Sequence, residues 1–233
     1  MKQNEIGRSM IEMLGVLAII GVLSVMGLAA YSKAMAKHKS NQMIQYITQT
    51  IQHTRIAFGT QRDYKGMGDS QAEIANVMFN ADLAPKEMLV MDANGEFAKP
   101  YVFKNTFKGG FSMRYSDRTL VGDKAAFVIH LDGLPKTACI DIATAAWGGA
   151  NSGGYVGLTI NQAIVDVENN DSQEGDDQEE SSGAVVLTGN CKATPLGQRG
   201  KTTYCAGKGP IPMAAAVNGC LDPNNNSIEI KLY

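Results

Sequence analysis

Recognisable catalytic motifs are absent from this sequence. The chain has only three histidines, and none belongs to an HExxH pattern, a nucleophile elbow or a pair at metal-ligand spacing. We expect His38, His53 and His130 to be surface or interface residues. The glycine-rich piece Gly207-Lys208-Gly209 lacks the spacing of a phosphate-binding loop, and a proline rather than a helix follows it. The chain is therefore not expected to be an enzyme.

Zinc-binding and nucleic-acid-binding patterns are absent as well. The four cysteines include no CxxC pair and no Cys/His cluster, so a zinc site is not expected. Outside the cytoplasm an even number of cysteines favours disulfides, and four cysteines allow three pairings. Residues 1–65 hold eight Lys or Arg against three Asp or Glu, a net charge of +5. No basic patch interleaved with aromatic residues accompanies this excess, so we expect contacts with lipid headgroups or acidic neighbours rather than with nucleic acid.

Charge is also missing from residues 13–31, where Leu, Ile, Val, Met, Ala and Gly fill nearly every position. A helix of that length measures about 28 Å, close to the ~30 Å hydrocarbon core of a bilayer. Glu12 lies at the start of this segment. A carboxylate costs about 2.5 to 3.5 kcal/mol at the centre of a membrane helix and less near an interface, so Glu12 needs a cationic partner. Arg8, four residues earlier on the same helix face, is one candidate.

A short polar leader ends in Gly7, and Arg8-Ser9-Met10-Ile11-Glu12 then leads into the apolar segment. This pattern resembles the class III signal of type IV prepilins and pseudopilins. The resemblance implies that a prepilin peptidase cuts between Gly7 and Arg8. It also implies that Glu12 pairs with the freed N-terminal amine of a neighbouring subunit during assembly, and that the new N-terminus at Arg8 is a candidate for methylation. The family usually has Phe or Met at that first position.

An ordinary secretory signal is the alternative interpretation of the same residues. Lys2 and Arg8 would be its basic end, the apolar run its core, and Ala34-Met35-Ala36 its cleavage site. The run is longer than the usual 7 to 15 or so residues of such a core, and it contains Glu12 near its start. The mature chain would begin at Lys37 under this interpretation and at Arg8 for a prepilin.

After the apolar segment no helix breaker occurs before Gly59. Apolar residues recur on one helical face, at Ile44, Ile47, Ile51 and Phe58. This spacing predicts one helix from about residue 9 to residue 58, apolar all round in its first half and along one stripe in its second. The expected organisation is a leader (1–7), this helix (8–58, with 13–31 in the membrane or the filament core) and a globular head (59–233).

The head is predicted to be an antiparallel sheet with short helices, which makes the protein α+β. Ser70 and Glu73 form a capping-box pattern at the start of one short helix. Pro135 introduces another, over residues 138–147. Strand-like segments cover residues 88–91, 111–115, 125–131, 155–160, 184–188 and 227–232.

This layout resembles the globular domain of type IVb major pilins, in the short helix ending near Pro85 and in the stretch from Leu134 to Trp147. The resemblance implies that Cys139 pairs with Cys220 and hence Cys191 with Cys205. It implies a subunit that forms a helical homopolymer with the help of prepilin peptidase and an inner-membrane assembly platform. Such a subunit is first an inner-membrane protein and then part of a surface pilus for adhesion, DNA transfer or aggregation. The alternatives are a pseudopilin of a type II secretion system and a membrane-anchored domain that does not polymerise.

An acidic segment lies between the predicted strands of the head. It lacks the spacing of an EF-hand loop, and such runs are usually solvated. Two other interpretations stay open: weak calcium binding, as in some pseudopilins, and contact with basic residues of an adjacent subunit. Its acidic residues are Asp166, Glu168, Asp171, Glu174, Asp176, Asp177, Glu179 and Glu180.

Overall fold

A computed structural model describes residues 5–61, 63–117, 124–147, 154–165, 184–187, 200–205 and 211–233. The chain divides into two units, residues 1–38 and residues 39–233. The first is called the N-terminal unit below and the second the head. Residues 39–58 belong to the head, because their apolar stripe is part of its core.

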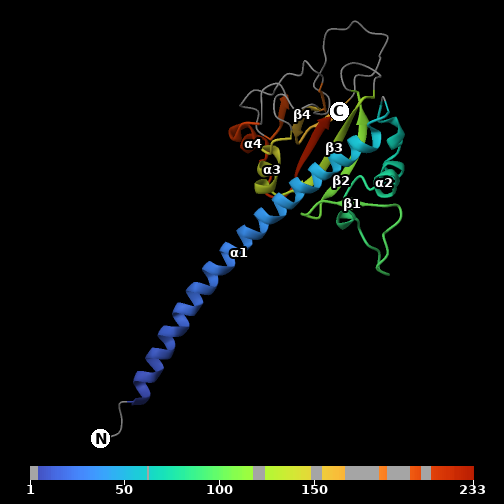
Figure 1. Cartoon of the computed structure of the whole chain (residues 1–233). Coiled ribbons are helices and arrows are strands. Elements are labelled where there is room, and N and C mark those ends of the chain that lie inside the picture. The colour runs from blue at the N-terminus through green and yellow to red at the C-terminus, as the bar shows by residue number, and fades with distance from the viewer. Residues whose placement is uncertain are drawn as a thin grey trace. The chain divides into compact units, whose positions relative to one another are not determined.

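Helix α1 (Glu5–Phe58) is the long helix labelled in Figure 1. It ends at the predicted residue, where Gly59 and Thr60 form a turn. It begins at Glu5, four residues before the predicted start. The reason is that residues 5–8 contain no proline, and a single glycine does not stop a helix that a long apolar run already propagates.

The head is built on one antiparallel sheet in the order β1-β2-β3-β8-β4-β7. The C-terminal strand β8 lies at the centre, paired with β3 on one side and β4 on the other. The strands are β1 (Phe103–Lys104), β2 (Gly110–Ser116), β3 (Ala126–Leu134), β4 (Tyr155–Ile160), β7 (Thr202–Cys205) and β8 (Asn226–Leu232). A second sheet pairs β5 (Ala163–Val165) with β6 (Ala184–Val186) in parallel.

Short helices follow α1 and also lie between strands. They are η1 (Lys65–Met67), α2 (Gln71–Asn80), η2 (Lys86–Met88), α3 (Lys136–Ala143) and α4 (Met213–Gly219). The first three come before β1, α3 lies between β3 and β4, and α4 lies between β7 and β8. The predicted capping box of α2 is confirmed, since Ser70 Oγ accepts from the Glu73 N–H and the Glu73 carboxylate accepts from the Ser70 N–H.

Two local predictions about the head were wrong. The second predicted helix ends at Ala143 rather than at residue 147, where the chain turns: the Ala145 N–H and the Trp147 indole N–H both donate to the Ile142 carbonyl, at 3.2 and 2.9 Å. Residues 88–91 form two isolated bridges, Leu89 with Phe103 and Met91 with Phe97, instead of a strand. Helix α4 and the short strands β1, β5 and β7 had no counterpart among the predicted elements.

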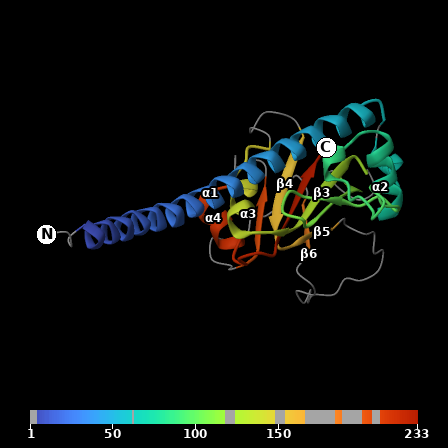
Figure 2. The same cartoon turned by 90° about the horizontal axis from the view of Figure 1, so that it is seen from below.

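The main core of the head lies between the sheet and the last part of α1. Met43, Ile47 and Ile51 of α1 are buried in one cluster with Ile129 of β3 and Ile230 of β8. Figure 2 shows this part of α1 running along one face of the sheet, with β5 and β6 on the opposite face. The second face therefore carries its own small apolar cluster, formed by Val128, Val156, Ile164 and Leu187.

Candidate functional site

The N-terminal unit presents an apolar surface on every side of its helix. Fourteen apolar side chains between residues 10 and 31 are each more than half exposed, from 52% for Ile20 to 74% for Ile11. Monomeric soluble proteins rarely expose apolar surface of this extent, so such a surface marks a site of contact with lipid or protein. This helix is the main candidate functional site of the chain.

The same helix is long and apolar enough to cross a membrane, judged by length and composition alone. Its most apolar window has a mean hydropathy of 2.4. Ser24 is the one hydroxyl residue within residues 13–30, and its Oγ donates to the Ile20 carbonyl at 2.7 Å. A hydroxyl satisfied within its own helix is compatible with an environment that offers no water.

Glu12 lies in α1 where the apolar surface begins, and its side chain is exposed. The two residues of the predicted cleavage site, Gly7 and Arg8, are both in α1, but their side chains lie outside the described part of the chain. Pairing of Glu12 with Arg8 or with an amine of another subunit, cleavage after Gly7 and methylation of Arg8 therefore stay predictions.

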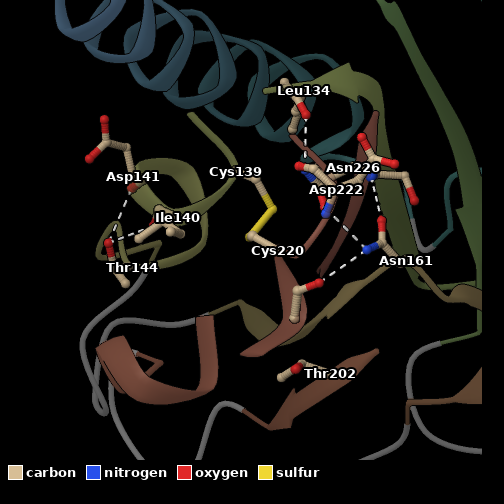
Figure 3. Close-up of a disulfide and its surroundings, with 12 residues drawn as sticks. Leu134, Cys139, Ile140, Asp141, Thr144, Asn161, Thr202, Cys220, Asp222 and Asn226 are labelled. Carbon is tan, nitrogen blue, oxygen red and sulfur yellow. Dashed lines mark hydrogen bonds between the residues drawn. A yellow bond between two sulfur atoms is a disulfide. The ribbon is translucent and has the colours of Figure 1, made fainter. Parts of the chain in front are cut away.

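In the head, Cys139 of α3 and Cys220 after α4 form a disulfide across 81 residues of sequence. This is the pairing that the resemblance to pilins implied. Both cysteines are completely buried, and Figure 3 shows the disulfide between the α3 ribbon and the segment that leads to β8. It ties the C-terminal part of the head to α3. The other implied pair, Cys191 with Cys205, is not tested because Cys191 lies outside the described residues.

Two asparagines beside the disulfide fix the connections around it (Figure 3). Asn161 has a positive φ of 53°, a conformation that asparagine tolerates better than most residues. Its Nδ2 donates to the main-chain oxygens of Gly200 and Gly219, at 3.0 and 3.1 Å, and its Oδ1 accepts from the Ser227 N–H at 2.8 Å. Asn226 is completely buried, and its Nδ2 donates to the Leu134 carbonyl at 3.1 Å. Neither residue belongs to a sequence motif that would have predicted this role.

The opposite face of the sheet carries a buried carboxylate, Glu229 of β8. His130 Nδ1 lies 3.0 Å from one of its oxygens, and the Arg114 guanidinium and the Ile164 N–H donate to the other at 3.1 and 2.6 Å. Arg114 also donates to the Ile164 carbonyl. Two side chains therefore hold one residue of β5 on the sheet. Burial raises the pKa of Glu229, but the hydrogen bonds and the nearby positive charge lower it by more, so the net pKa is below its ordinary value.

The contacts of Glu229 are those of a structural anchor. Its carboxylate oxygens are bound by His130 of β3, Arg114 of β2 and Ile164 of β5, and the side chain is only 8% exposed. His130 also lies 3.9 Å from Asp132, measured from Nε2 to Oδ2. The predicted acidic segment, residues 166–180, falls outside the described residues, so neither calcium binding nor contact with another subunit is tested.

Two solved pilin structures are similar to this chain. No protein-family model matches the sequence, and no curated protein matches it. A type IVb pilin from Salmonella typhi is similar in structure, at 16% identity and a TM-score of 0.47 over 82% of this chain and 97% of that chain. TcpA, a type IV pilin from the Vibrio cholerae El Tor biotype, is similar at 11% identity and a TM-score of 0.47 over 82% of this chain and 98% of that chain.

Proposed function

We propose that this chain is a pilin-like structural subunit, made as a membrane precursor and assembled into a filament through its N-terminal helix. The observation that carries the proposal is the apolar surface of residues 10–31, which contains a single carboxylate, Glu12, near its start. In this function a precursor is cut between Gly7 and Arg8 by a prepilin peptidase, and an inner-membrane platform assembles the mature subunits.

The size of the apolar surface supports this role. Removing fourteen such side chains from water is worth about 20 kcal/mol at about 1.5 kcal/mol each. The surface therefore needs cover before assembly and after it. Lipid supplies the cover in the precursor, and the helices of neighbouring subunits supply it in a filament.

In this assembly Glu12 sets the axial offset between neighbouring subunits. A carboxylate and an amine in an apolar environment are each unfavourable alone and far less so as a pair. Cleavage after Gly7 creates such an amine at Arg8, four residues before Glu12. When Glu12 of one subunit binds the amine of the next, subunits that slide along one another lose the pair, and one axial offset is favoured.

The head fits a location outside the cytoplasm. Its buried Cys139–Cys220 disulfide is stable in an oxidising compartment. Its core is complete without the N-terminal unit, because the helical stripe of residues 43–58 and both faces of the sheet are already covered. The head can therefore remain folded while the N-terminal helix moves from lipid into a filament.

Electron microscopy of cells that carry a prepilin peptidase and an assembly platform tests the proposal. Wild-type chain should give surface fibres, and Glu12→Ala should give none while the protein still accumulates in the membrane. Glu5→Ala is the matched control, because Glu5 lies in the leader and its loss should leave the fibres unchanged. Normal fibres from Glu12→Ala would refute the assembly mechanism.

Sequencing the mature N-terminus separates the remaining interpretations. Arg8 as the first residue supports the prepilin, and Lys37 would indicate a secreted protein without the apolar helix. A chain that starts at Arg8 and gives only short assemblies within the envelope would favour a secretion pseudopilin. One that starts at Arg8 and stays monomeric would favour a membrane-anchored domain.

A further inference from the structure

The chain contains two Asn-Gly pairs, Asn94-Gly95 and Asn218-Gly219. In this dipeptide the main-chain nitrogen of glycine reaches the Asn side chain more readily than the nitrogen of any other following residue would. The reason is that glycine has no Cβ to shield its nitrogen and its backbone turns freely. The structure places the two pairs in opposite environments. They therefore allow a comparison within one molecule.

Asn94 and Gly95 lie at an exposed turn between Met91 and Phe97, which form an isolated bridge. The Asp92 carboxylate accepts the N–H groups of Asn94 and Glu96, at 2.8 and 3.0 Å. Within residues 63–117, all of which the structure describes, no hydrogen bond holds the Asn94 side-chain amide. It is free to approach the next peptide group.

Gly95 offers little resistance to that approach. Its φ is +80°, and a Cβ built on it would meet nothing within 4 Å. Its N–H makes one exposed hydrogen bond, to the Asp92 carbonyl, at a long 3.2 Å. Water competes for this bond, so the peptide group can turn without disturbing packed structure.

The second pair is held on several sides. Asn218 and Gly219 are in helix α4, where the Asn218 carbonyl accepts from the Gly200 N–H at 2.9 Å. The Gly219 carbonyl accepts from Asn161, one of the two asparagines labelled beside the disulfide in Figure 3. Gly219 is buried, and a Cβ on it would lie 2.7 Å from Thr202 Oγ1. Rotation of this peptide group requires the end of α4 to open.

We propose that Asn94 is a site of spontaneous deamidation and isomerisation in the folded protein, and that the fold protects Asn218. The Gly95 nitrogen loses its proton to solvent and bonds to Cγ of Asn94, and the Cγ–Nδ2 bond breaks. The departing nitrogen takes up a proton and leaves as ammonia, so a cyclic imide remains. Water then opens the imide at either carbonyl, which gives Asp or isoaspartate. In sum, one amide and one water become one carboxylic acid and one ammonia, with no oxidation or reduction.

The product changes the turn in two ways. A new carboxylate appears beside Asp92 and Glu96, so three negative groups share one exposed tip. In the isoaspartate form the chain gains a methylene at residue 94, which displaces the N–H groups that the Asp92 carboxylate accepts. The surface at this turn therefore changes with the age of the protein. This reaction does not depend on filament formation.

The proposal is tested by ageing full-length protein in mildly alkaline detergent buffer made with ¹⁸O-water. Peptide mapping by mass spectrometry then measures how much label each site has taken up. Label should enter residue 94 at least about tenfold faster than residue 218, because opening the second site breaks at least two hydrogen bonds first. In concentrated urea the two sites should react at similar rates, because their local sequences then decide. Asn94→Gln should abolish label at position 94, since the ring formed by the longer side chain closes slowly, and it leaves position 218 as an internal control.

Each outcome decides the proposal. Faster label at Asn94 in the folded protein, with convergence in urea, supports it. Equal rates in the folded protein would overturn it, and so would a folded protein in which Asn94 stays unlabelled while unfolded chain reacts. A difference that persists unchanged in urea would also overturn it, since the protection would then not come from the fold.

Discussion

Removing the Cys139–Cys220 disulfide should destabilise the head by about 4.5 kcal/mol. The value follows from the 81-residue separation of the two cysteines, because a cross-link of that span removes loop-closure entropy from the unfolded chain. The whole stability of a typical domain is about 5–15 kcal/mol. The double variant Cys139→Ala/Cys220→Ala should therefore remain folded in buffer and unfold at a much lower urea concentration.

Urea unfolding of the full chain in detergent micelles measures this loss. The single tryptophan, Trp147, reports on the same region, because its Nε1 donates to the Ile142 carbonyl of α3 at 2.9 Å. The matched control is Cys191→Ala/Cys205→Ala, whose predicted loop of about 15 residues corresponds to only about 3 kcal/mol. A loss below about 1 kcal/mol for the first variant, or a larger loss for the control, would refute the loop-entropy reasoning.

Two further predictions concern buried polar groups of the head. Glu229→Gln should cost about 2 kcal/mol at neutral pH. Because the folded pKa of Glu229 is lowered, its stabilisation is present above the unfolded value of about 4.3 and is lost as pH falls through the folded pKa. The free energies of unfolding of the wild type and of Glu229→Gln, measured by urea titration, should therefore converge in acid. A difference that stays constant with pH would contradict this. Thr54→Val should stabilise the head by about 1 kcal/mol in the same assay, because the buried Thr54 hydroxyl has no hydrogen-bond partner among the described residues. Thr48→Val, at an exposed hydroxyl that donates to the Ile44 carbonyl, should give no gain.

Features that depend on neighbouring residues could be predicted from the sequence. The apolar run of residues 13–31, the end of α1 at Phe58 and the capping box of α2 each follow from a pattern within one or a few helical turns. The α+β class followed from the same local signals. The Cys139–Cys220 pair came from the resemblance, since spacing alone left three pairings open.

The anchors of the head could not be predicted in this way. Asn161 gives only a weak turn signal in the sequence, and Glu229 reads as one polar residue in an alternating strand. Their roles appear only when β8 lies between β3 and β4, which brings residues 65 or more positions apart into hydrogen-bonding distance.

The sequence by itself determined the long helix, its apolar surface and the acid at its start, because helical periodicity and the absence of charge are properties of consecutive residues. Only the tertiary structure decided which strand occupies the centre of the sheet, which carboxylate is buried, and which of two identical Asn-Gly pairs is free to react. Those outcomes depend on contacts between distant parts of the chain. A local sequence pattern does not show which distant residue a side chain will contact.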